Sequence, residues 1–260
     1  MTAAWRPTPV DGIDLVEGVV HLWAGGPDGS VGLLRPDAPY SSPGLGRLVV
    51  AAAFARAWAG GRLDAGERTV LTRGRDLGDR GVLPSLGAGL NPTWRDLLVI
   101  ALTLEDREAV SRLCVRLGAL EVADAATALG MAGAAMQGFP AVVPTASARQ
   151  GAAAILGLAQ AVGSEGLGLL LPLLRDGRYR WRVRTRLAEE WEVATVGSRV
   201  AHAVEELALW RTQDGWAAAA MAWTQADDAW RAEYAMGDAF RRVVDRIGAP
   251  LPLAAEEAER

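Results

Sequence analysis

Lysine is absent from this chain, and its absence removes one class of chemistry. All 27 basic residues are arginine. Without lysine there is no ε-amine that could act as a general base or form a Schiff base with a carbonyl compound. Arginine does not take over these tasks, because its guanidinium group stays protonated in proteins. Enzymes that depend on a catalytic lysine are therefore excluded.

Residues that bind metals are almost as scarce. Cys114 is the only cysteine, which excludes an internal disulfide and a thiolate metal cluster. The two histidines, His21 and His202, lie far apart in the sequence and have no partner at the spacing of metal ligands. We therefore predict no metal site and no cofactor.

Long apolar runs are missing as well. No run reaches the roughly 18 residues that a membrane-spanning helix needs, and residues 1–12 lack the apolar centre of a signal peptide. A net charge of −4 gives no general attraction to nucleic acid or to an anionic membrane. We expect a cytoplasmic protein with no membrane partner.

One segment, residues 175–186, interleaves arginines with aromatic residues. This pattern is typical of proteins that bind nucleic acid. Three glutamates close behind it can neutralise the positive charge: Glu189, Glu190 and Glu192. We therefore favour a surface segment over a nucleic-acid site.

The chain does contain enough apolar residues for a large core, because half of its 260 residues are hydrophobic. Its centre is the stretch from Tyr40 to Gly61. Ser42 is a suitable N-cap and Pro43 a suitable first residue for a helix. The residues that follow are nearly all apolar, and Gly60-Gly61 is a typical helix end. This pattern predicts a helix buried on every side.

The rest of the chain predicts an α+β fold. Residues 12–36 indicate a β-hairpin, and three further strands are predicted at 192–199, 203–211 and 216–224. Between them, helices are predicted from Thr93 onward and at 107–117, 121–129, 148–162 (capped by Thr145) and 168–175, with an irregular stretch at 132–143. A last helix covers 226–247. We expect a single domain, 1–260, in which both chain ends build one five-stranded antiparallel sheet (about 12–36 and 190–250) and a helical part (about 40–185) lies between them.

Several local patterns occur in the order that one enzyme family shows. Tyr40 opens the segment that leads into the buried helix, and Gly61-Arg62-Leu63-Asp64 follows that helix. Glu105-Asp106-Arg107 comes after the helix that Thr93 begins, and Thr195-Val196-Gly197-Ser198 lies in a late strand. In these features and in layout the chain resembles the serine β-lactamases and penicillin-binding proteins, and most of all the class A β-lactamases. The resemblance implies the β-lactamase/transpeptidase-like fold.

The family's catalytic residues are replaced. Counting from Tyr40, the serine of the family's Ser-x-x-Lys motif falls on Gly44 and its lysine on Arg47. The Ser-Asp-Asn motif becomes Glu105-Asp106-Arg107, and Lys-Thr-Gly becomes Thr195-Val196-Gly197. Acyl-enzyme chemistry needs a nucleophile and a base to activate it. Gly44 has no side chain and Arg47 cannot accept a proton, so on this alignment β-lactam hydrolysis by the family mechanism is excluded.

Arg47 and Glu105 are the candidate site residues, because the family positions that they occupy touch each other. One interpretation is an ion pair that fills the former cleft. The other is a new site in which Arg47 or Arg107 binds an anion and Glu105 acts as acid or base. The remaining binding positions are Gly44, Thr195, Val196, Gly197 and Ser198. The resemblance implies a structural role for Asp106, and we do not favour Ser41 or Ser42 as a replacement nucleophile.

Three functional hypotheses follow. The first is a catalytically degenerate protein that binds a small molecule, as an accessory factor in specialised metabolism. The second is a repurposed enzyme, a hydrolase, cyclase or isomerase, that uses Glu105 without a serine intermediate. The third is a structural protein or interaction partner, including a homodimer.

Overall fold

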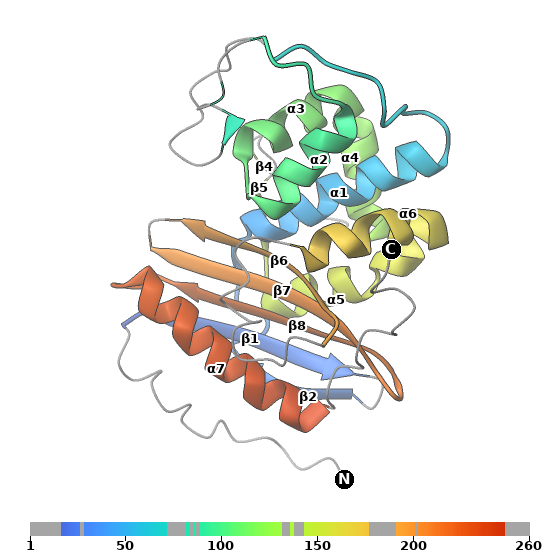
Figure 1. Cartoon of the computed structure of the whole chain (residues 1–260). Helices are drawn as coiled ribbons and strands as arrows, with labels where there is room; N and C mark the ends of the chain where they lie inside the picture. Colours follow the sequence, from blue (N-terminus) through green and yellow to red (C-terminus); the bar gives the residue numbers. More distant parts are fainter. Residues whose placement is uncertain are drawn as a thin grey trace. The chain divides into compact units, whose positions relative to one another are not determined.

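The computed structural model describes residues 17–26, 29–71, 82–83, 86, 89–131, 136–137, 143–176, 191–200 and 202–247 (Figure 1). These residues form two compact units. The sheet unit takes the described residues of Met1–Tyr40, Ala146–Leu156 and Arg180–Arg260, and the helical unit takes those of Ser41–Thr145 and Gly157–Tyr179. Ala146–Leu156, which we expected in the helical part, thus belongs with the sheet.

The sheet unit contains the five-stranded antiparallel sheet that the sequence predicts. Its strands are β1 (Val19–Gly26), β2 (Gly29–Leu34), β6 (Val193–Val200), β7 (Ala203–Thr212) and β8 (Gly215–Thr224). Their order is β2-β1-β8-β7-β6, so β8 from the end of the chain pairs with β1 from its beginning. The prediction that both chain ends build one sheet is therefore confirmed.

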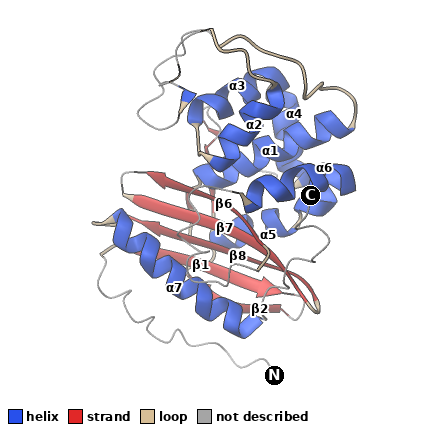
Figure 2. Cartoon of the chain, viewed as in Figure 1, coloured by secondary structure: helices blue, strands red, loops and turns tan. Residues whose placement is uncertain are grey.

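A helix covers each face of this sheet. Helix α7 (Ala229–Ile247) lies across one face (Figure 2), and its apolar side packs there in a core that includes Trp210, Trp223 and Phe240. On the other face α5 (Ala148–Leu156) comes so close that a methyl group on Gly151 would lie 2.9 Å from Leu207 Cδ2. The alternating side chains of the strands are thus buried on both sides.

The helical unit is built around α1 (Pro43–Ala59). Every residue from Gly44 to Ala55 is buried, which confirms the prediction of a helix without an exposed face. Around it lie α2 (Trp94–Thr103), α3 (Arg107–Leu117), α4 (Ala119–Ala128) and α6 (Leu158–Arg175). A helix apolar on all sides is stable in water only when other helices enclose it in this way.

The predicted helix N-caps are confirmed in part. Thr93 and Asp96 form the full capping box at the start of α2, with Asp96 N–H bonded to Thr93 Oγ1 at 3.0 Å and Thr93 N–H bonded to Asp96 Oδ2 at 2.8 Å. Ser42 does precede α1, but its side chain makes no capping hydrogen bond. Its backbone N–H bonds the Pro144 carbonyl instead, at 2.9 Å.

Three predictions in the middle of the chain are wrong. The helix expected at 148–162 is not continuous, because α5 ends at Leu156 and α6 begins at Leu158. The helix end expected after residue 162 does coincide with a kink inside α6, where Gly163 is non-helical (φ 70°, ψ 178°). Ser147, not Thr145, caps α5, because it exchanges hydrogen bonds with Gln150. The stretch 132–143, expected to be irregular, holds the short strand β4 (Met136–Gln137) and the start of β5 (Val143–Ala146), which also neighbours β3 (Tyr40–Ser41).

Within the described part of the chain, no single helix has the length and apolarity to cross a membrane; only α5 and α6 counted together reach them.

Candidate functional site

The helical unit brings the two main candidate residues together. Arg47 lies in the second turn of α1, and Glu105 lies just before the first turn of α3. Arg47 Nη2 is 3.5 Å from Glu105 Oε2, and the two side chains are only 8% and 15% exposed. The contact that the sequence predicts between these positions is therefore present.

This buried ion pair is loose. Hydrogen-bonded pairs of arginine and carboxylate are usually about 2.7–2.9 Å apart. The more exposed pair Arg62–Glu121 of the same unit lies closer to this range. Its distances from Arg62 Nη2 to the two carboxylate oxygens of Glu121 are 2.8 and 3.0 Å. At 3.5 Å the Arg47–Glu105 contact is longer than such a hydrogen bond, and neither residue is without further interactions.

Glu105 is held in an unusual backbone conformation. Its φ of 54° lies in the left-handed region, which residues other than glycine enter rarely and at a cost of about 1–3 kcal/mol. Such conformations persist where the surrounding structure enforces them, and they concentrate at binding and catalytic sites. The local geometry therefore marks Glu105 independently of its charge.

The next residue, Asp106, is anchored by hydrogen bonds. It is fully buried and caps α3, where its Oδ1 accepts a hydrogen bond from Ala109 N–H at 2.9 Å. Its other oxygen accepts hydrogen bonds from Val82 N–H at 2.6 Å and Leu83 N–H at 2.9 Å. One carboxylate thus ties a distant loop to the start of α3, which is the geometry that a structural role requires.

The other two candidates of this unit differ in exposure. Gly44 is buried in the first turn of α1, where no acidic side chain is present. Arg107, the first residue of α3, is exposed. An exposed cation and a buried cation of the same unit, Arg107 and Arg47, both suit an anionic group.

The sheet unit holds the remaining predicted positions on its edge strand β6. Thr195 pairs with Ala208 and Gly197 with Glu206, on the face that α7 covers. Val196 and Ser198 pair with Leu207 and Glu205, on the opposite face. Because successive residues of a strand face opposite sides, the four residues cannot all face one ligand.

Two buried carboxylates escaped the sequence analysis. Glu205 and Glu206 are almost fully buried in the middle of β7, on opposite faces of the sheet. Ser198 Oγ lies 3.4 Å from Glu205 Oε2. The sequence does show two consecutive acidic residues within a mostly apolar predicted strand. A strand pattern alone, however, does not distinguish a buried acidic residue from one at an exposed edge.

The structure gives both histidines other neighbours. His21 is buried in β1 with its ring centroid 5.0 Å from that of Tyr40, and desolvation lowers its pKa. His202 Nδ1 lies 3.3 Å from the Ala226 carbonyl oxygen. Across the described ranges no group of three or more histidine, cysteine, aspartate or glutamate side chains could hold a metal ion.

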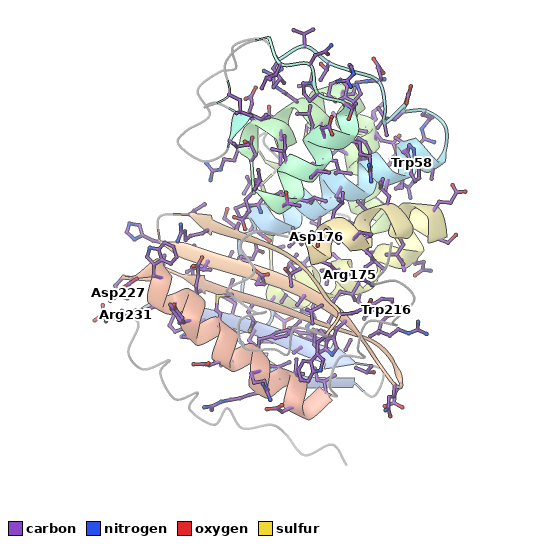
Figure 3. All side chains as sticks on the ribbon, in the orientation of Figure 1. Trp58, Arg175, Asp176, Trp216, Asp227 and Arg231 are labelled. Carbon is purple, nitrogen blue, oxygen red and sulfur yellow. The ribbon has the colours of Figure 1, made fainter. Side chains whose placement is uncertain are left out.

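The arginine-rich segment 175–186 falls mostly outside the described residues. Only Arg175 and Asp176, at the end of α6, are placed (Figure 3). The interpretation of this segment as a surface stretch therefore stays a prediction.

Comparisons with known proteins agree with this architecture. The sequence profile of the β-lactamase enzyme family matches residues 25–248. Among solved structures, the chain is similar to a β-lactamase from Sphaerobacter thermophilus (21% identity, TM-score 0.80, 92% of this chain and 95% of that one). It is also similar to a β-lactamase from Xanthomonas campestris (16%, 0.74, 92% and 95%) and to an ancestral class A β-lactamase (19%, 0.74, 88% and 94%).

At such low identities these likenesses establish the fold alone. The β-lactamase/transpeptidase-like fold predicted from the sequence is thereby confirmed. A search of curated protein sequences gave no match.

Proposed function

Because the chain belongs to the β-lactamase enzyme family, we propose that it is a non-acylating member, which binds an anionic small molecule beside Arg47 and does not open β-lactams through a serine ester. The fold is kept while the residues that form the ester are replaced. Fold alone does not carry activity, so the residues at the site decide.

The Arg47–Glu105 contact is the observation that carries this proposal. The alignment with the family places Arg47 at the Ser-x-x-Lys lysine and Glu105 at the serine of Ser-Asp-Asn, two positions that touch in the family. Their 3.5 Å separation here supports that alignment. The same count from Tyr40 puts Gly44 at the nucleophile, where no side chain can attack a carbonyl carbon.

The geometry favours an anion as ligand. Arg47 is a buried cation whose partner carboxylate lies 3.5 Å away, at the outer limit of hydrogen-bonding distance. A ligand carboxylate or phosphate that forms two parallel hydrogen bonds to the guanidinium group would interact more strongly than Glu105 does. Exposed Arg107 would raise the local concentration of anions.

The first test is intact-protein mass spectrometry after incubation with a penicillin and with a broad fluorophosphonate. We expect no adduct with either reagent. An adduct on Ser41 or Ser42 would refute the alignment and restore a serine hydrolase. An adduct on any other serine would equally refute a non-acylating protein.

The second test measures binding of a probe set of acetate, benzoate and inorganic phosphate by thermal shift. We expect a concentration-dependent stabilisation that Arg47→Ala abolishes. Arg62→Ala is the matched control, because it removes an arginine from a surface ion pair of the same unit. Equal responses of the two variants, or none in the unaltered protein, would refute an anion site at Arg47.

A second candidate function is non-covalent acid–base catalysis by Glu105. The observation that favours it is the left-handed backbone of Glu105, directly before the anchored Asp106. Turnover of any compound that the binding screen identifies should fall at least 100-fold in Glu105→Gln, the lower end of what general acid–base catalysis contributes. Glu121→Gln, which alters the surface pair, should leave turnover unchanged. Full turnover in Glu105→Gln would refute the catalytic role.

A further inference from the structure

Residues 35–40 connect the end of β2 to the segment that leads into α1, and we call them the linker. They pack against His21 of β1, which is only 4% exposed. The ring centroids of Tyr40 and His21 lie 5.0 Å apart, and the backbone carbonyls of Arg35 and Ala38 are close enough to act on the pKa of the imidazole. The linker is therefore part of what keeps His21 out of water.

The imidazole of His21 is placed for its neutral form. Its Nε2 lies 3.4 Å from Thr224 Oγ1, and this hydroxyl donates its hydrogen to the Val19 carbonyl at 3.4 Å. The Thr224 oxygen can then only accept from Nε2–H, which leaves the lone pair on Nδ1. Nδ1 is buried and, among the described residues, has no hydrogen-bond partner. Protonation would therefore place a charge and an unpaired N–H in the interior, which is costly.

The surroundings of His21 disfavour its charge. Desolvation lowers its pKa most, and the positive charge of Arg35 adds to this effect, whereas the two linker carbonyls oppose it. The other charged groups on the elements around it are Asp37 of the linker, Arg149 of α5, and Glu205 of β7, which Ala222 separates from His21 in one cross-strand row. The hydrogen bond from Arg149 lowers the pKa of Asp37, so this pair stays ionised at mildly acidic pH. Both conditions that lower the pKa of His21, burial and Arg35, thus depend on the linker.

We propose that the linker opens, that is, detaches from the sheet, when His21 takes up a proton, while the rest of the sheet unit stays folded. Because His21 binds a proton less readily under the closed linker than under the open one, proton uptake must favour the open form. An uncovered imidazole has the ordinary pKa of about 6.5. With the covered imidazole neutral throughout, the ratio of open to closed molecules rises about eightfold between pH 7.0 and 5.5. The outer attachment of the linker, the exposed Arg149–Asp37 pair, opposes opening only weakly.

Two backbone amides report on the linker in hydrogen exchange followed by NMR. Ala38 N–H bonds the Arg35 carbonyl at 3.2 Å, and Arg149 N–H, in the first turn of α5, bonds the Pro36 carbonyl at 3.0 Å. After correction for intrinsic rates, the protection of both amides should fall about three- to eightfold from pH 7.0 to 5.5. Urea at 1 M should leave their exchange unchanged, because local opening exposes little surface, but should accelerate exchange of Ala232 N–H in α7. Unchanged protection, or a urea response equal to that of Ala232, overturns the proposal.

The pH profile of this exchange identifies the group that takes up the proton. In the unaltered chain, protection of the two amides should be level above about pH 7.5 and should fall below about pH 6.5. The fall should disappear in His21→Gln, whereas the matched control His202→Gln, which changes the other histidine, should keep it. A fall that begins only below about pH 5, or one that persists in His21→Gln, would assign the proton to a carboxylate such as Glu205 and overturn the proposal. If His21→Gln does not fold, the profile of the unaltered chain still decides between the two groups.

Discussion

Gly166, in α6, offers a sharp test of the packing around α1. An alanine Cβ at this position would lie 2.8 Å from Val162 Cβ and 3.2 Å from Ala55 Cβ. Neither atom can turn aside, since both are attached directly to helical backbone. Ala55 is fully buried in α1, and the backbone after Val162 turns sharply at Gly163, where φ is 70° and ψ is 178°. The backbone of α6 or α1 must therefore shift to accommodate Gly166→Ala.

The magnitude follows from two opposed effects. Overpacking a well-packed interior costs about 1–3 kcal/mol, and two close contacts put Gly166→Ala near the upper end. Alanine gains about 0.5–1 kcal/mol over glycine in a helix. We expect a net loss of about 2 kcal/mol in the free energy of unfolding.

Gly168→Ala is the matched control. Gly168 lies in the same helix, is exposed, and has no atom within 4 Å of an added Cβ. This variant should gain about 0.5–1 kcal/mol. Because both changes restrict the unfolded chain equally, the comparison isolates the steric contribution in the folded protein.

Urea denaturation followed by far-ultraviolet circular dichroism measures the difference. The midpoint of Gly166→Ala should fall below that of the unaltered protein, and the midpoint of Gly168→Ala should lie at or above it, with similar slopes. If Gly166→Ala is as stable as Gly168→Ala, then α6 does not pack on α1 as closely as the structure has it.

Three further predictions concern stability. Asp106→Ala should lower the free energy of unfolding, measured by denaturation, by about 3 kcal/mol, because it removes a helix cap (about 1) and leaves one buried and one partly buried N–H group without acceptors (about 1 each). A loss below about 1 kcal/mol would contradict the anchoring role. Burial lowers the pKa of His21 in the folded protein, so the unfolded chain is protonated first as the pH falls below the unfolded pKa of about 6.5. The free energy of unfolding should therefore decrease between about pH 7 and 5.5, and it should decrease less steeply in His21→Gln. Equal pH dependence of the two proteins would contradict a neutral, buried His21. Gly151→Ala should cost only about 1 kcal/mol, because the 2.9 Å contact is with a terminal methyl group of Leu207 that can rotate; a loss above 3 would show a more rigid contact.

Much of the fold could be predicted because its signals are local. The helix at 107–117 and the strands of the late sheet lie within a residue or two of their predicted bounds, since caps, glycines and alternation act over a few residues. The kink at Gly163 follows directly on the helix end predicted at residue 162, whereas no local pattern announces the interruption between Leu156 and Leu158. Ser147 and Thr145 are both acceptable caps, and only the partner Gln150 decides between them.

The candidate site was less accessible from sequence. The contact between Arg47 and Glu105, 58 positions apart by their numbering (105 − 47), came from alignment with a family and not from any local signal. The strained backbone of Glu105 and the three hydrogen bonds of Asp106 depend on how a distant loop folds back. Side-chain identity predicts which groups are available, and tertiary structure alone decides which of them meet.

The pairing of β1 with β8 has a consequence for the order in which the protein forms during synthesis. Val19 and Thr224, which face each other in the ladder, are separated by 205 positions. At a translation rate of about 5–20 residues per second, β1 waits roughly 10–40 s before its partner strand leaves the ribosome. All segments of the helical unit are synthesised before β6, so this unit can collapse around α1 while the first hairpin still exposes an unpaired edge. The sheet unit is then the last part to close, and its early hairpin is the segment most in need of protection from aggregation in a nascent chain.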